Sequence, residues 1–138
     1  MREIPSVYAA IPIRMNEQAR QIYLFIKSQG RFPIIPLLLF PPDSYNYDTF
    51  PRRNIYRVCF SLVGISDEVW IFGIGAGALK EYERKRNQSG LVRSFVTSFD
   101  SELEEYSKSE HYQEPKYIDL AREVIATSEF VADITKKL

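Results

Sequence analysis

The sequence has little that marks a secreted, metal-binding or membrane-embedded protein. It contains one cysteine and one histidine in 138 residues, which excludes an intramolecular disulfide, a cysteine-based zinc cluster and a histidine pair. No apolar run approaches the roughly 18 residues that span a bilayer, and the N-terminus lacks the apolar segment of a signal peptide. We therefore expect a cytoplasmic protein without a metal, in which Cys59 is a small core residue and His111 lies at the surface.

The chain also lacks a net charge. Lys plus Arg and Asp plus Glu both number 18, so there is no overall positive field to attract nucleic acid or an anionic membrane. We expect neither as a partner. A chain of this length with 45% hydrophobic residues is long enough for one core and too short for two ordinary domains. It is predicted to form a single domain over residues 1–138.

Apolar segments alternate with segments of helical periodicity. The pattern predicts strands over 6–13, 31–40, 69–72 and 91–97 and helices over 15–30, 51–64, 78–90 and 115–138. Such alternation favours a parallel sheet with right-handed crossovers. We predict an α/β fold, a Rossmann-like (flavodoxin-like) three-layer sandwich with a mostly parallel sheet of four to five strands and helices on both faces. Pro33 and Pro36 remove ladder donors, which places segment 31–40 at the edge of the sheet.

The last predicted helix has a long apolar stripe. Its members recur at helical spacing and are Tyr117, Leu120, Ala121, Val124, Val131, Ile134 and Leu138. A stripe of this length either closes the sheet or docks on a second subunit.

The most informative segment runs from Glu68 to Glu81, where an apolar strand enters a glycine-rich turn and then a helix. Gly73, Gly75 and Gly77 are expected to let the backbone turn and approach a ligand without a Cβ in the way. A ligand site is expected at the carboxyl end of such a strand. The spacing does not match Gly-x-Gly-x-x-Gly, so NAD binding is not expected, and we predict no cofactor.

Three segments together resemble a known family. They are 7–13, with an aromatic residue, small residues and a proline; 65–72, with an Asp before an apolar strand; and 77–81, which reads Gly-x-x-x-Glu. Their order resembles the nucleoside 2-deoxyribosyltransferase-like enzymes, which are small Rossmann-like proteins that cleave N-glycosidic bonds. The resemblance implies that Glu81 is the nucleophile and that the chain forms a homodimer or larger homo-oligomer. Family members usually carry an Asp on the helix before the third strand, where this chain has Arg57, Val58 and Cys59.

The chemistry gives each candidate catalytic residue a role. Cleavage of a ribosyl–base bond passes through an oxocarbenium-like state, which a carboxylate such as Glu81 stabilises or traps covalently. Tyr8, expected at the carboxyl end of the first strand, either orients that carboxylate or is a partly buried packing residue of the strand. Asp48 and Asp100 are candidates for the acid that protonates the leaving base. A structural interpretation of Glu81 also stands, because an acid in a helix's first turn is favoured by the macrodipole and Lys85 is its i+4 partner.

Further residues are candidates for substrate binding. Tyr45 and Tyr47, in a turn-rich loop, can stack on a base or mark a protein interface. Arg14 is a possible phosphate ligand or a solvated side chain. Asp67 positions the ribose or forms a turn. Pro12 joins this set through the family resemblance.

The leading hypothesis is cleavage or transfer at the N-glycosidic bond of a 2′-deoxyribonucleoside or its 5′-monophosphate. The main alternative is a non-catalytic nucleotide-binding or sensor domain on the same scaffold, since fold does not determine function. A third is a partner-binding module that uses the tyrosine loop and the last helix. The expected partner in the first two cases is a nucleoside or nucleotide.

Overall fold

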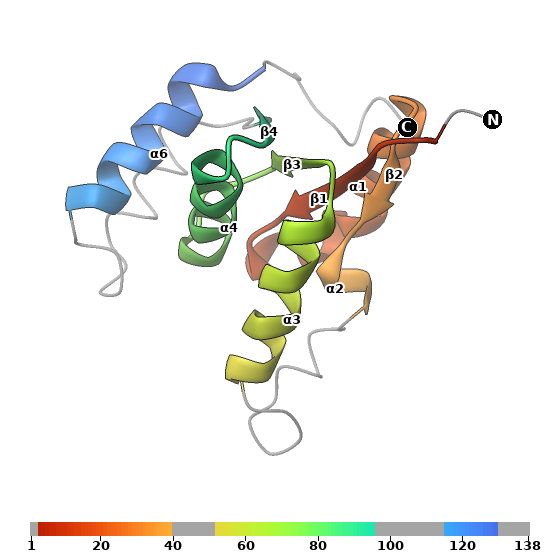
Figure 1. The fold of residues 1–138 in the computed structure, drawn as a ribbon, viewed down its shortest axis with the longest axis horizontal. Helices are drawn as coiled ribbons and strands as arrows, with labels where there is room; N and C mark the ends of the chain where they lie inside the picture. The colour runs from red at the N-terminus through yellow and green to blue at the C-terminus, as the bar shows by residue number, and fades with distance from the viewer. Residues whose placement is uncertain (1–2, 40–51, 96–114, 130–138) are drawn as a thin grey trace.

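The computed structural model describes residues 3–39, 52–95 and 115–129. Four parallel strands form one sheet in the order β2-β1-β3-β4. The strands are β1 (Ser6–Ala10), β2 (Phe32–Ile34), β3 (Glu68–Ile71) and β4 (Leu91–Ser94). The central pairing sets Val7 beside Glu68 and Ala10 beside Ile71. The fold is therefore the α/β, Rossmann-like architecture that the alternating sequence pattern predicts (Figure 1).

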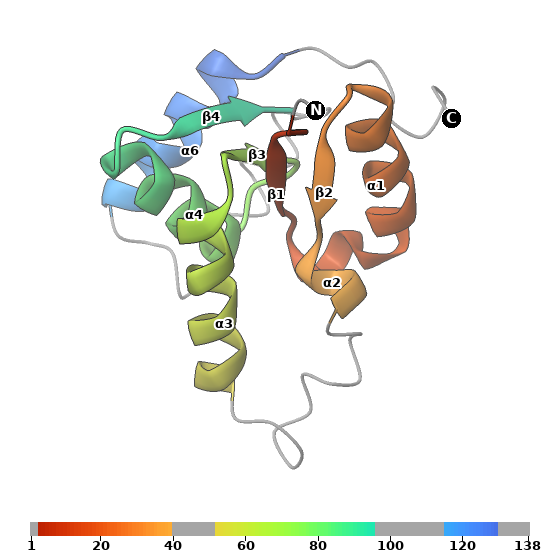
Figure 2. The same ribbon diagram turned by 45° about the vertical axis from the view of Figure 1, so that its right-hand side comes forward.

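Helices cover both faces of this sheet. The 3-10 helix η1 (Ile13–Gln18) leads into α1 (Ala19–Ser28), and α2 (Pro36–Leu39) follows β2. The remaining helices are α3 (Arg52–Ile65), α4 (Ala76–Asn87) and α6 (Pro115–Thr127). Figure 2 shows α1 on one side of β1 and β2, with α3 and α4 on the other.

Alternating strand residues contribute side chains to two separate hydrophobic cores, because successive side chains of a strand point to opposite faces of the sheet. Tyr8 and Val69 face the larger core, which α3, α4 and α6 cover. Ala9 and Trp70 face the smaller core under α1. The smaller core contains a cluster of aromatic rings from Phe25, Trp70, Phe72 and Phe95. The centroids of these rings lie 5.1–6.5 Å from one another. Cys59 is buried in the larger core, as predicted, and burial raises the pKa of its thiol to about 11.

The segment predicted as one strand over 31–40 is instead a short strand followed by a helical turn. β2 ends at Ile34, and Pro36 opens α2, because proline's fixed φ suits the first position of a helix and it lacks a ladder donor. The predicted edge position is correct. The backbone N–H of Phe32 donates to the Pro5 carbonyl at 2.9 Å, so the next N–H, which Pro33 lacks, would point away from the sheet.

The described part of the last helix packs against the protein's own core, while the Tyr117 side chain of its stripe is outside the described part of the structure. Leu120, Ala121 and Val124 of α6 are buried in the larger core. The helix extends to Thr127 in the described part of the chain. Val131, Ile134 and Leu138 lie outside the described residues.

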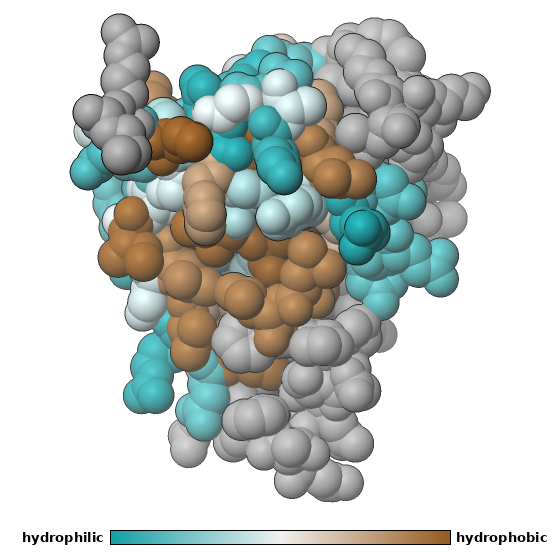
Figure 3. All heavy atoms as spheres, turned by 90° about the vertical axis from the view of Figure 1, so that its right-hand side faces the viewer, coloured by the Kyte–Doolittle hydropathy of each residue, from teal (hydrophilic) through white to brown (hydrophobic). Residues whose placement is uncertain are grey.

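Large apolar side chains remain exposed beside the edge strand. We define the β2 edge surface as Ile4, Phe32, Leu38 and Leu39, and Phe32 is 61% exposed. Figure 3 shows apolar side chains gathered over this side of the molecule. Such an accumulation is more typical of an interaction surface than of a solvated face.

Candidate functional site

Tyr8 and Glu81 are in direct contact although 73 residues separate them. Tyr8 is a buried residue in the middle of β1, and its hydroxyl donates a hydrogen bond to Oε2 of Glu81 on α4. The sequence led us to expect Tyr8 at the carboxyl end of this strand. That expectation is wrong, because Tyr8 is the central residue of β1. It reaches Glu81 because α4 packs across β1 and β3 on the face to which Tyr8 points.

The surroundings of this pair are apolar. Tyr8 belongs to the larger core, together with Ile55, Ala78, Tyr82 and Leu120. Burial raises the pKa of the Glu81 carboxyl well above its ordinary value of 4.5, because a low-dielectric environment disfavours the charged form. A carboxyl group with a raised pKa can hold a proton near neutral pH and exchange it with a reacting group.

The structural interpretation of Glu81 is wrong in both of its parts. Helix α4 begins at Ala76, two residues earlier than predicted, and its first turn contains no acidic residue. Glu81 is therefore too far along the helix to gain from the macrodipole. Lys85 does not pair with it either: its buried ammonium donates to the carbonyl oxygens of Val63 at 3.2 Å and Ser66 at 2.5 Å.

The glycine turn lies where the sequence places it, between β3 and α4. This is the carboxyl end of β3, beside that of β1, where the strand order changes direction and ligands of such folds bind. However, a Cβ on Gly73 would lie 2.5 Å from Met15 Sδ and 3.0 Å from Pro12 Cδ. The close approach at Gly73 is therefore to this chain's own side chains.

The other two glycines of the turn do not need their conformational freedom. Gly75 is the N-cap of α4 with φ −167° and ψ 162°, an extended conformation open to any residue. A Cβ on Gly77 would meet no atom within 4 Å. Among the described residues the only positive φ values belong to Gly30 and Ser89. The backbone conformations at Gly75 and Gly77 therefore do not require glycine, and the expectation that these residues let the chain approach a ligand stays a prediction.

Pro12 and Arg14 follow β1 at the same edge of the sheet. Pro12 is buried against the Gly73 backbone. Arg14 lies in η1, and its side chain is outside the described part of the structure. Met15, the first residue of the helix predicted over 15–30, fills the space at Gly73. No pattern in the sequence distinguishes this packing role.

Asp67 lies at the opposite end of β3 from the glycine turn. Its Oδ2 accepts hydrogen bonds from the Ser6 backbone N–H at 2.7 Å and the Ser6 hydroxyl at 3.1 Å, which ties the starts of β1 and β3 together. The backbone N–H of Ser6 is the main reason why the pKa of Asp67 is lowered. Asp67 thus has a structural role between two strands, and a role in positioning a ribose stays a prediction. The remaining candidates, Tyr45, Tyr47, Asp48 and Asp100, lie outside the described residues.

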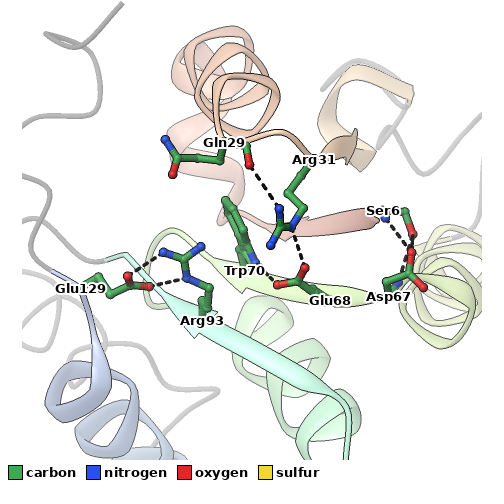
Figure 4. A network of polar contacts seen from close by, with 8 residues as sticks. All are labelled: Ser6, Gln29, Arg31, Asp67, Glu68, Trp70, Arg93 and Glu129. Carbon is green, nitrogen blue, oxygen red and sulfur yellow. Dashed lines mark hydrogen bonds and ion pairs between the residues drawn. The ribbon is translucent and has the colours of Figure 1, made fainter. Parts of the chain in front are cut away.

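A second polar network, which the sequence does not reveal, lies on the other face of the sheet. Glu68, buried at the start of β3, accepts from Arg31 Nε at 2.8 Å and from Trp70 Nε1 at 3.1 Å. Arg93 donates to both carboxylate oxygens of Glu129 at 2.5 and 2.6 Å and lies over the Trp70 ring, 4.5 Å from its centroid. Figure 4 shows that these charges are directed at one another. The network is a structural clamp between β2, β3, β4 and the end of α6.

Two absences concern the described residues alone. Within residues 3–39, 52–95 and 115–129, no group of three or more His, Cys, Asp or Glu side chains is arranged to hold a metal ion. In the same ranges, no helix has the length and apolar character needed to cross a membrane.

Comparison with known proteins identifies no relative: no protein-family model matches the chain, and no curated protein sequence matches it at a significant level. The function is therefore inferred from the geometry around Tyr8 and Glu81.

Proposed function

We propose that the chain cleaves or transfers at the N-glycosidic bond of a 2′-deoxyribonucleoside or its 5′-monophosphate, with Glu81 as the catalytic carboxylate. The contact between Tyr8 and Glu81 in apolar surroundings carries the proposal. Burial raises the pKa of Glu81, and a carboxyl group whose pKa is strongly raised beside a specific hydroxyl partner is typical of functional sites. The likeness of the sequence to nucleoside 2-deoxyribosyltransferase-like enzymes supports the same reaction class.

The proposed reaction has two balanced steps. In the first, an ionised Glu81 oxygen attacks the anomeric carbon as the carbon–nitrogen bond breaks, and the base leaves with the bonding electrons and a proton. In the second, water or another base attacks the anomeric carbon as its bond to the Glu81 oxygen breaks, and the attacking group loses its proton to the residue that protonated the first base. Tyr8 orients the carboxylate through its hydrogen bond. Asp48 remains the candidate for the acid that protonates the base.

The raised pKa of Glu81 sets the expected pH dependence of this reaction. Because burial favours the protonated form, attack requires prior loss of the Glu81 proton. Base release should therefore increase as the pH rises through the raised pKa. In Tyr8→Phe the carboxylate loses its hydrogen-bond donor, so the increase should shift to higher pH.

The decisive assay is chromatographic detection of free base from a panel of deoxynucleosides and deoxynucleoside monophosphates. Wild type should release base, and Glu81→Gln should not. Glu17→Gln is the matched control, because Glu17 is exposed on η1. Addition of a second base distinguishes transfer from hydrolysis. No release by folded wild-type protein from any substrate would refute the proposal.

One observation favours the alternative of a non-catalytic nucleotide-binding or sensor domain. Among the described residues, no second carboxylate is hydrogen-bonded to Tyr8 or Glu81. In that case a neutral Glu81 only anchors α4 to β1. Nucleotide binding without turnover, unchanged in Glu81→Gln, would support this alternative.

We also propose that the protein is a cytoplasmic homodimer or larger homo-oligomer. The described part of α6 is buried in its own core, so the β2 edge surface is the better candidate for the contact. Light scattering should show a mass above that of the 16.1 kDa chain, which Phe32→Lys should reduce. A monomeric wild type at micromolar concentration would refute this assembly.

A further inference from the structure

Helices α3 and α4 form an open hollow that is separate from the Tyr8–Glu81 pair. Its volume is about 400 Å³, and its lining residues are Tyr56, Arg57, Phe60, Ser61 and Arg84. This volume lies within the range of small-molecule sites, roughly 300–1,000 Å³. Glu81 does not line the hollow, because its side chain is directed at β1.

The hollow has a local positive charge in a chain that is neutral overall. Arg57 and Arg84 both line it, and none of the described residues that line it is acidic. In the described part of the chain, Arg31, Arg86 and Arg93 each pair with a glutamate, whereas neither Arg57 nor Arg84 forms such a pair. Two guanidinium groups without carboxylate partners favour an anion, and phosphate suits their planar donors best.

Aromatic rings and a hydroxyl complete the lining. The Arg84 guanidinium lies over the Phe60 ring, 5.4 Å from its centroid, and both residues line the hollow. Tyr56, one helical turn earlier on α3, is 43% exposed and offers a ring on which a planar base can stack. The Ser61 hydroxyl donates to the Arg57 carbonyl at 3.0 Å, so its oxygen can still accept from a sugar hydroxyl.

We propose that this hollow is a second binding site, which takes a nucleoside monophosphate. The phosphate binds to Arg57 and Arg84, and the base stacks on Tyr56. We assign this site a binding role only and no chemical step. Binding there is independent of the reaction proposed for Glu81 and does not require it.

The test is calorimetric titration with adenosine 5′-monophosphate, adenosine and inorganic phosphate at low ionic strength, where screening of exposed charges is weakest. Adenosine 5′-monophosphate should bind at least about tenfold more tightly than adenosine or inorganic phosphate alone. Arg57→Gln and Arg84→Gln should each weaken it by about 10- to 100-fold, as expected for a lost charge-assisted hydrogen bond. Tyr56→Ala should weaken the monophosphate by about tenfold and leave phosphate binding unchanged.

Two control variants distinguish binding in this hollow from binding elsewhere on the protein. Arg20→Gln removes an exposed charge on α1 and should not change the affinity. Glu81→Gln should bind the monophosphate as tightly as wild type, whether or not it has lost base release. Circular dichroism establishes that each variant is folded. Equal affinity for phosphate and monophosphate, no binding at all, weakening by Arg20→Gln, or loss of binding in Glu81→Gln alone would overturn the proposal.

Discussion

Replacing Glu81 with glutamine should change how stability depends on pH. The folded protein holds a proton on Glu81 above pH 4.5, because burial raises the pKa of this carboxyl. The unfolded chain releases that proton near the ordinary value. Raising the pH therefore favours the unfolded state, and wild type loses stability from pH 4.5 upward until the pH passes the raised pKa. The glutamine of Glu81→Gln does not titrate in this pH range, so the variant does not lose stability in this way.

The magnitude follows from the linkage relation. Each pH unit between 4.5 and the raised pKa should cost wild type at most about 1.4 kcal/mol relative to the variant. The glutamine carbonyl can still accept the Tyr8 hydrogen bond, so the contact itself is retained. Urea unfolding at one-unit intervals from about pH 5 to about pH 8 gives the free energy of unfolding of both proteins.

The difference in free energy should increase with pH and then level off at the raised pKa. Glu17→Gln, at an exposed position, should give a curve parallel to that of wild type. A difference that is constant with pH, or that decreases, would mean that Glu81 is ionised in the folded protein. Burial would then not be what controls the protonation of this carboxyl.

Three further predictions test the packing. Gly73→Ala should lower the free energy of unfolding by about 1–3 kcal/mol through overpacking, because its Cβ would lie 2.5 and 3.0 Å from neighbouring side chains. In Gly77→Ala the new Cβ meets no atom within 4 Å. This variant should be neutral or stabilised by up to about 1 kcal/mol. Equal effects in urea unfolding would contradict this contrast. Lys85→Met should cost about 1–3 kcal/mol in the same assay, because it removes the ammonium donor from the Ser66 carbonyl and leaves the Val63 carbonyl with the Ser66 hydroxyl as its side-chain donor. A change below about 0.5 kcal/mol would show that water replaces the ammonium. Cys59, whose pKa is about 11 instead of 9.0, should carry about 100-fold less thiolate at about pH 8 than an ordinary cysteine and react with a disulfide reagent only as the protein unfolds. Rapid reaction in the folded state would contradict its burial.

The order of the elements was predictable because hydrophobic periodicity reports local geometry. Strands with buried faces produce short apolar runs, as in Glu68–Ile71, and amphipathic helices produce the spacing seen in Ala19–Ser28. Boundaries were less accurate. α4 begins at Ala76 rather than near Ala78, and Pro36 starts a helix within a predicted strand, because caps and turns depend on a few backbone angles that periodicity does not encode.

The candidate site was only partly predictable. Glu81 follows from the glycine turn, and Tyr8 from the first strand. Their contact, however, depends on how α4 crosses β1, and this crossing buries Glu81 enough to raise its pKa. The i+4 spacing of Glu81 and Lys85 suggested an ion pair, but the structure directs Lys85 to the end of α3. Spacing along a helix gives proximity of backbone positions, whereas the nearest partner of a long side chain is set by tertiary packing.

The sequence by itself determined the fold class, the position of the glycine turn after a buried strand and the core position of Cys59, because each of these depends on local pattern or on burial of apolar side chains. Only the tertiary structure decided that Gly73 accommodates Met15 and Pro12, that Asp67 ties β1 to β3, and that Arg57 and Arg84 line the same hollow. These relations join residues far apart in the chain, and they exist only once the helices have packed against the sheet.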